Sequence, residues 1–172
     1  MMIELHQVSI GQHIKSLSLT VEDGGLVCIS GSKGSGKTTL LRAIMGFIPI
    51  DGGHISIDGE LLTPLSAPWF RRFTAYVPQH LSMPDGCRME GFEQWADSSA
   101  DERYLMLLTR AVRSKKPLLI VDEPASALPM EMADKVDCLL REAQQQGATV
   151  VAVNDRLTDE GNVITLNAQF SE

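Results

Sequence analysis

The chain has 172 residues, of which 44% are hydrophobic and 22% charged, and its formal net charge is −7. These values predict one soluble globular domain over residues 1–172, large enough to fold without disulfides or a structural metal. The acidic balance argues against a general nucleic-acid binder, which needs a basic surface to displace counterions. Three scattered cysteines show neither a disulfide framework nor zinc-ligand spacing, which favours buried or inert thiols in a reducing compartment. We also expect a cytoplasmic protein, because the sequence shows no long apolar run and no signal peptide.

Hydrophobic periodicity predicts alternating strands and helices along the chain. Strands are expected over residues 2–5, 14–21, 26–29, 53–59, 75–78, 118–121 and 149–153, the last being the final core strand. Helices are expected over residues 38–45, 99–112 and 130–146, and a loop over residues 82–97. This order predicts an α/β fold in which helices flank a mostly parallel sheet, with an additional N-terminal antiparallel part.

A phosphate-binding loop lies between the third predicted strand and the first predicted helix. Residues 31–38 match the pattern G-x-x-x-x-G-K-[ST] without a substitution. Its glycines let successive backbone N–H groups point at phosphate oxygens, and the helix adds its positive N-terminal end. We expect Lys37 to contact the β- and γ-phosphates and Thr38 to hold Mg²⁺. The predicted nucleotide-binding residues are Gly31, Ser32, Lys33, Gly34, Ser35, Gly36, Lys37, Thr38 and Thr39.

An acidic pair, Asp122 and Glu123, follows the buried strand at residues 118–121. In open α/β sheets this edge is where ligands bind, so the pair is expected to lie beside the phosphate loop. Asp122 would then bind Mg²⁺, and Glu123 could act as the general base on the attacking water. The alternative is a strand that ends in a solvated acidic turn.

Taken in order, these motifs resemble the nucleotide-binding domain of ATP-binding cassette (ABC) proteins. The resemblance covers residues 6–154 and includes the hairpin at residues 53–59, the sequence Tyr-Val-Pro-Gln at residues 76–79, and residues 109–112. It implies a P-loop NTPase fold that binds ATP and Mg²⁺. It also implies that Gln79, in the family's Q-loop, senses the γ-phosphate, assists Mg²⁺ and links the site to a partner.

The family's signature, close to LSGGQ, is altered here. It aligns with residues 98–102, so that Ser99 remains, Ala100 and Asp101 replace the glycines, and Glu102 replaces glutamine. In family dimers the signature contacts the γ-phosphate of the other subunit. Asp101 would bring a carboxylate toward that phosphate, at a cost of ~4 kcal/mol at about 4 Å and an effective dielectric near 20. The favoured interpretation is that Ser99 and Glu102 form a capping box on a helix that has no signature function.

Other family positions have also changed. Pro129 follows residues 126–128 where the family's D-loop has aspartate, and Asn154, a candidate catalytic residue, replaces the switch histidine. The aromatic residue that stacks on adenine has no clear counterpart, since Ile10 or His13 occupies that region. Lys33 stands where the family usually carries serine or asparagine. Only 20 residues separate Gln79 from Ser99, so residues 82–98 are expected to be a remnant of the family's helical subdomain.

The resemblance implies an ATP-binding subunit of an ABC-type system, which hydrolyses ATP slowly or only with a partner and drives or gates a membrane transporter. The expected partners are a second ABC subunit, in a homo- or heterodimer, and a membrane permease that would place the chain on the cytoplasmic face of the membrane. The alternative is a non-hydrolysing, ATP-gated regulatory or scaffold protein without a transport role. A small kinase is disfavoured by residues 122–123 and Gln79, and by the lack of an arginine-rich lid. Arg71 and Arg72 are expected to lie in a solvated turn.

Overall fold

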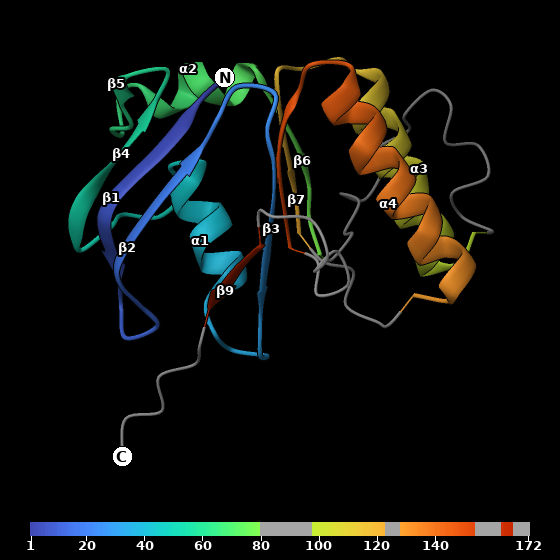
Figure 1. The fold of residues 1–172 in the computed structure, drawn as a ribbon, viewed down its shortest axis with the longest axis horizontal. Helices are drawn as coiled ribbons and strands as arrows, with labels where there is room; N and C mark the ends of the chain where they lie inside the picture. Colours follow the sequence, from blue (N-terminus) through green and yellow to red (C-terminus); the bar gives the residue numbers. More distant parts are fainter. Residues whose placement is uncertain (80–97, 123–127, 154–162, 167–172) are drawn as a thin grey trace, which may run out of the picture.

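Two β-sheets organise the molecule (Figure 1). The computed structural model describes residues 1–79, 98–122, 128–153 and 163–166. In chain order the elements are β1 (Ile3–Ile10), β2 (Ile14–Val21), β3 (Leu26–Gly31), α1 (Lys37–Ile44), β4 (Gly52–Ile57), β5 (Glu60–Leu61), α2 (Ala67–Arg72), β6 (Thr74–Val77), α3 (Ala100–Arg113), β7 (Leu118–Val121), α4 (Met130–Gln145), β8 (Thr149–Val153) and β9 (Val163–Leu166).

The N-terminal sheet has the strand order β2-β1-β4-β5 and is antiparallel. β1 is twice as long as the predicted strand at residues 2–5. The register shifts between Leu5 and Val8, and Gln7 has a φ of 47°. This bulge lets both Leu5 and Val8 face the core although three positions separate them. The prediction was therefore too short because the bulge interrupts the period of two.

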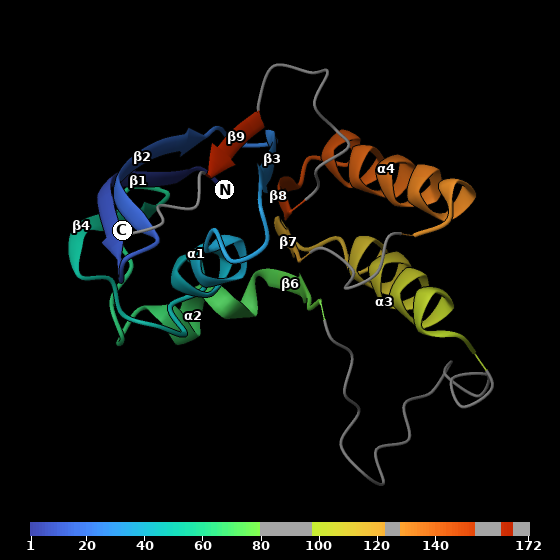
Figure 2. The ribbon, with the colours of Figure 1, turned by 90° about the horizontal axis from the view of Figure 1, so that it is seen from below.

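The second sheet is parallel and has the strand order β6-β7-β8-β3-β9. Figure 2 shows α1 on one side of it and α3 and α4 on the other. Along β7, Leu118 and Ile120 pack in the cluster that contains α1, whereas Leu119 and Val121 pack against α3 and α4. Because both faces are covered, the strand is wholly apolar, as the sequence predicted.

β9 is a strand that the sequence interpretation missed. Residues 149–153 form β8, but they are not the last core strand, since β9 pairs in parallel with β3 beyond them. Cys28 pairs with Val163, and the hydroxyls of Ser30 and Thr165 lie 3.1 Å apart. β9 has only four residues at the edge of the sheet and is partly buried, so it carries little periodic signal.

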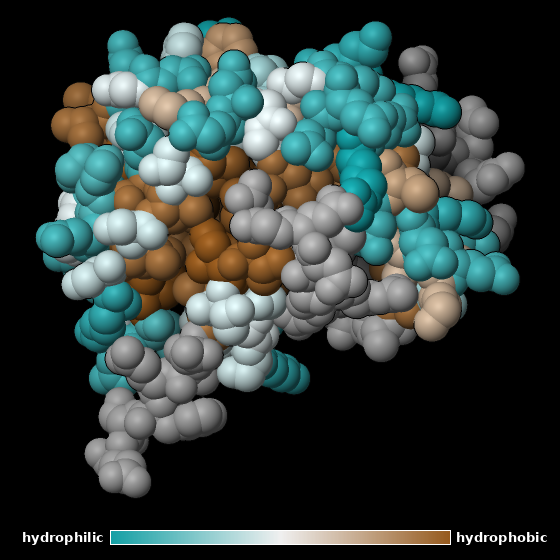
Figure 3. All heavy atoms as spheres, viewed as in Figure 1, coloured by the Kyte–Doolittle hydropathy of each residue, from teal (hydrophilic) through white to brown (hydrophobic). Residues whose placement is uncertain are grey.

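The core has two parts, one on each side of the parallel sheet. The first joins α1 to both sheets and the second joins α3 and α4 to β6, β7 and β8. Leu40, Leu41 and Ile120 are fully buried in the first part, and each such side chain contributes about 1.5–3 kcal/mol. Figure 3 shows apolar residues at the centre of one face, between the two sheets, with hydrophilic residues around them.

Arg71 is not in a solvated turn, contrary to the sequence interpretation. Residues 67–72 form α2, a helix of six residues with Pro68 in its first turn. The Arg71 guanidinium donates to the carbonyl oxygen of Met45 at 3.0 Å and lies 4.9 Å from the centre of the Phe47 ring. It therefore satisfies the C-terminal end of α1, whereas Arg72 is exposed as expected.

The described cysteines differ in exposure. Cys28 is buried in β3 and burial raises the pKa of its thiol to about 11, so this cysteine is inert as expected. Cys138 is exposed on α4, which the expectation of buried thiols did not anticipate. Cys87 and most of the predicted helical remnant at residues 82–98 lie outside the described residues.

None of the helices in the described ranges has the length and apolar character that a membrane crossing needs.

Candidate nucleotide-binding site

The phosphate loop connects the end of β3 to the start of α1. Gly31 has a φ of 147°, and a Cβ atom there would lie 2.3 Å from the carbonyl oxygen of Leu166 and 2.8 Å from Oγ of Ser35. Only glycine fits between the loop and β9. A Cβ atom on Gly34 would meet nothing within 4 Å, so the outer side of the loop is open to a ligand.

His13 lies beside the same loop. A Cβ atom on Gly36 would lie 3.0 Å from Cβ of His13 and 3.4 Å from Cγ1 of Ile14. The sequence left Ile10 and His13 as alternatives for the position that contacts adenine. Ile10 is buried in the first part of the core, whereas His13 is exposed next to the loop. Of the two, His13 alone is accessible to a nucleotide.

Lys37, the first residue of α1, folds back over its own loop. Its ammonium group donates to the carbonyl oxygens of Gly31 and Ser32, the latter at 3.4 Å. The N-terminal end of α1 carries no side-chain cap hydrogen bond and no acidic residue in its first turn. Ser35 is fully buried, and its hydroxyl has no hydrogen-bond partner among the described residues. Together these groups offer N–H, O–H and ammonium donors to an anion.

Thr38 and Asp122 come together although 84 positions separate them. The Thr38 hydroxyl donates to Oδ1 of Asp122 at 3.2 Å, and only 2% of Asp122 is exposed. Asp122 follows β7 directly, and its N–H donates to the carbonyl oxygen of Val77 at 2.9 Å. A hydroxyl and a carboxylate are oxygen ligands of the kind that Mg²⁺ prefers, so the donor set fits this cation.

Two tyrosines that the sequence interpretation did not assign to the site approach Asp122. The Tyr104 hydroxyl, from α3, donates to the carbonyl oxygen of Asp122 at 2.8 Å. Burial raises the pKa of Tyr76, and the Asp122 carboxylate raises it further, while Arg42 acts in the opposite direction. Tyr76 therefore stays a neutral phenol beside the carboxylate. Nothing in the local sequence distinguished Tyr104 from an ordinary apolar position of its helix.

The structure describes one of the three predicted catalytic residues. Gln79 is partly buried two residues after β6, the strand that pairs with β7. Glu123 and Asn154 lie outside the described residues, as do residues 126 and 127 of the altered D-loop. The structure thus brings Lys37, Thr38 and Asp122 to one edge of the sheet, and the roles of the other candidates stay predictions.

The start of α3 has the predicted capping box. The N–H of Glu102 donates to Oγ of Ser99 at 3.2 Å, and the N–H of Ser99 donates to the Glu102 carboxylate at 2.7 Å. The Ser99 N–H, and to a smaller extent the Ser99 hydroxyl, lower the pKa of the Glu102 carboxyl. Ala100 and Asp101 occupy the first turn of the helix. The predicted cap is confirmed, whereas the absence of a signature function stays a prediction.

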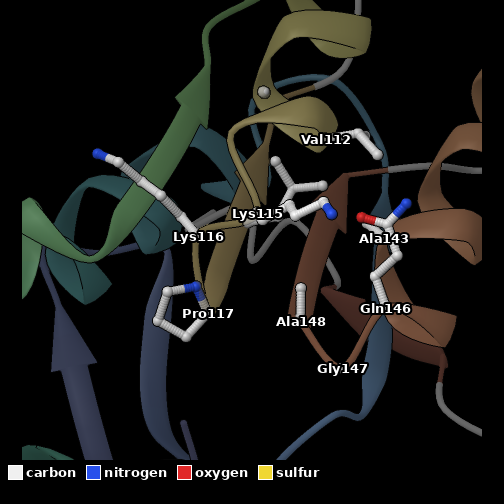
Figure 4. A pocket seen from close by; sticks show the side chains of 10 residues that line it. Val112, Lys115, Lys116, Pro117, Ala143, Gln146, Gly147 and Ala148 are labelled. Carbon is white, nitrogen blue, oxygen red and sulfur yellow. The ribbon is translucent and has the colours of Figure 1, made fainter.

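A separate hollow of about 190 Å³ lies at the opposite end of β7 from Asp122. It is lined by the ends of α3 and α4 and by the residues that precede β7 and β8. Figure 4 shows Lys116 pointing away from it, and Lys116 donates to the carbonyl oxygen of Thr74 at 2.9 Å. The hollow is therefore not part of the nucleotide site.

Comparisons with known proteins agree with this geometry. A family model described as "ABC transporter" matches residues 14–105, more than half of the chain. The thiamine import ATP-binding protein ThiQ of Vibrio vulnificus is 29% identical over 92% of this chain and 82% of its own length. The spermidine/putrescine import ATP-binding protein PotA of Haemophilus ducreyi is also 29% identical, over 90% of this chain and 52% of its own length.

Solved structures show the same fold. A nucleotide-free ATP-binding cassette from an ABC transporter has a TM-score of 0.77 at 15% identity, over 98% of this chain and 90% of its own. A putative ABC transporter ATP-binding protein from Pyrococcus furiosus has a TM-score of 0.69 at 17% identity, over 96% and 98% of the two chains. The predicted fold class is confirmed, and the chain belongs to the ABC transporter family as one of its ATP-binding subunits.

Proposed function

We propose that this subunit binds ATP together with Mg²⁺ at the edge formed by the phosphate loop, Thr38 and Asp122. One observation carries the proposal: the Thr38 hydroxyl and the Asp122 carboxylate lie 3.2 Å apart beside an uncapped helix N-terminus. A triphosphate would accept the N–H groups of residues 31–38 and the ammonium of Lys37, which would leave its bonds to the loop carbonyls. Thr38, Asp122 and Gln79 would hold Mg²⁺, which supplies positive charge against the phosphate oxygens.

The remaining site residues have more specific roles in the proposal. Glu123 acts as the general base on the attacking water, and Asn154 donates a hydrogen bond to the γ-phosphate. His13 stacks on the adenine ring, which is supported by its exposed position against Gly36. Lys33, exposed in the loop, adds a positive charge near the phosphates. Residues 1–172 form a single nucleotide-binding domain in which the helical subdomain is much reduced.

The proposed activity is slow ATP hydrolysis, or hydrolysis that needs a partner subunit. In the family, a neutral signature contacts the nucleotide bound by the second subunit. Here Asp101 and Glu102 occupy that position, and their carboxylates would repel the nucleotide. This favours an asymmetric pair. In that pair the partner supplies an intact signature to the Lys37 site of this chain. The relatives named above are ATP-binding proteins of importers, so we propose that the pair drives or gates a permease at the cytoplasmic face of the membrane.

Calorimetry with ATP, in Mg²⁺ and then in EDTA, tests the binding proposal. We expect ATP to bind more tightly in Mg²⁺, and an equal affinity in both buffers would contradict the metal site.

To test the asymmetric pair, the Glu123→Gln variant is incubated with ATP·Mg²⁺ and its mass is measured by light scattering. We expect the isolated chain to stay monomeric. A homodimer with two occupied sites would rule out the asymmetric pair.

The second candidate is a non-hydrolysing regulator that ATP switches on or off. The capping box favours it, because the N–H groups of Ser99 and Glu102 are used within α3 rather than for a partner's phosphate. A phosphate-release assay with Mg²⁺ separates the two candidates. Turnover that Glu123→Gln abolishes supports the ATPase. Bound ATP that remains intact, with or without candidate partner subunits, supports the regulator.

A further inference from the structure

Tyr104 joins the helix that carries the altered signature to the acidic end of β7. Only 2% of the residue is exposed, and its hydroxyl donates to the carbonyl oxygen of Asp122 at 2.8 Å. Tyr104 lies two residues after the capping box and packs in the second part of the core, together with Val77 and Val121. The cap therefore stabilises the start of α3, and α3 in turn holds the Tyr104 hydroxyl in place.

The hydrogen bond acts on the residue that directly follows β7. β7 ends at Val121, and its described pairing with β8 ends at the same residue. A buried carbonyl needs a donor, and Tyr104 provides one. On the other side of the same residue, the N–H of Asp122 donates to Val77 at 2.9 Å. The backbone of Asp122 is thus held by α3 on one side and β6 on the other.

The position of this backbone determines where the carboxylate points. The Asp122 side chain accepts from Thr38 at 3.2 Å, so α1, β6 and α3 all contact one residue. A shift of a few tenths of an ångström in the main chain of Asp122 would alter the distance between its carboxylate and the Thr38 hydroxyl. A cation that tolerates little change in ligand distance, such as Mg²⁺, would respond to it.

We propose that Tyr104 is a positioning residue, whose hydrogen bond to the Asp122 carbonyl holds the carboxylate in the geometry that Mg²⁺·ATP requires. The inference rests on the proposed function, since it assumes that Asp122 serves the metal. It also assigns α3 a role within its own subunit, through Tyr104, that is separate from any contact of residues 98–102 with a partner.

The test compares two variants that each remove one buried hydroxyl-to-carbonyl hydrogen bond. Tyr104→Phe removes the bond to Asp122. Thr74→Val removes the bond from the Thr74 hydroxyl to the carbonyl oxygen of Phe70, which is 3.0 Å long and also buried, at the far end of β6 from the site. Each variant and the wild type are titrated with ATP in Mg²⁺ and in EDTA, and each is unfolded in urea.

We expect Tyr104→Phe to weaken binding in Mg²⁺ by about tenfold, corresponding to one net hydrogen bond, and to leave binding in EDTA within about twofold of the wild type. Thr74→Val should lower the urea midpoint similarly and leave both affinities unchanged. If Tyr104→Phe changed only the midpoint, as Thr74→Val does, the bond would be merely structural and the inference wrong. A wild type without any Mg²⁺ dependence would overturn the inference and the proposed metal site together.

A second variant keeps the inference testable if Tyr104→Phe does not fold. 4-Aminophenylalanine at position 104 retains the ring and an N–H donor at the place of the hydroxyl. We expect its affinity for ATP in Mg²⁺ to lie within about threefold of the wild type, because the donor is preserved. A folded 4-aminophenylalanine variant that had lost the Mg²⁺ dependence would overturn the inference.

Discussion

Two helices of this molecule begin in opposite ways. α1 starts after Gly36, which has a φ of 95°, and its first turn has no side-chain cap and no acidic residue. α3 starts after Ser99, with a complete capping box and with Asp101 and Glu102 in its first turn. The free N–H groups of a helix start attract an anion, and a capping box satisfies two backbone N–H groups there from within the helix.

This difference parallels the sequence prediction that the phosphate loop is intact and the signature altered. The start of α1 is left open for phosphate, with Lys37 and Thr38 beside it. At the start of α3 the same kind of donors are used by Ser99 and Glu102, and the added carboxylates would repel a phosphate. The start of α3 thus stabilises its own helix, and the prediction that it does not bind a second nucleotide is consistent with this cap.

The largest expected effect tests the open helix start. Lys37→Ala should weaken ATP binding by about 100-fold, since one hydrogen bond from a charged donor to a phosphate contributes up to about 3 kcal/mol. Calorimetry measures the affinity. The matched control is Lys33→Ala in the same loop, where the side chain is exposed and we expect a change of about threefold or less. Equal losses in the two variants would contradict the specific role of Lys37.

An intermediate effect tests the capped helix start. Ser99→Ala removes the side chain that accepts from Glu102, and it should lower the free energy of unfolding by about 1 kcal/mol. Urea unfolding measures this change. The affinity of the isolated chain for ATP should stay within about twofold of the wild type, because Ser99 serves its helix. A large loss of affinity without a loss of stability would contradict this assignment of Ser99 to its own helix.

The smallest effect is a pH dependence that arises from Glu102. Its pKa lies below the ordinary value of 4.5 because the charged carboxylate accepts the N–H of Ser99. The resulting stabilisation is complete above pH 4.5 and is lost as the pH falls through the lowered pKa of the folded state. The free energy of unfolding of the wild type should thus exceed that of Glu102→Gln by the largest amount above pH 4.5. The two free energies should become equal as the pH falls below the lowered pKa. Urea unfolding from pH 3 to 7 measures the difference, and a constant gap would contradict the pairing.

The sequence predicted the elements whose signal is local, and it missed those that depend on neighbours. The strand at residues 118–121 was predicted because both of its faces are covered and every residue is apolar. β1 was predicted too short because a bulge at Gln7 changes the side-chain period. Arg71 was assigned to solvent because no local pattern indicates that it meets the end of α1. Within the helix predicted at residues 99–112, no local signal marked Tyr104 as a contact of the site, because its hydroxyl partner is 18 residues away.

For the site, the sequence by itself determined the chemical groups, since residues 31–38 and Asp122 are recognisable from spacing and from the strand that precedes them. It also determined the capping box, because both partners lie within one helical turn. Only the tertiary structure decided that Thr38 and Asp122 meet, that His13 rather than Ile10 faces the loop, and that the Tyr104 hydroxyl meets the carbonyl oxygen of Asp122. These contacts join residues that are distant in the sequence. They are therefore fixed by how the helices and strands pack, which no local pattern encodes.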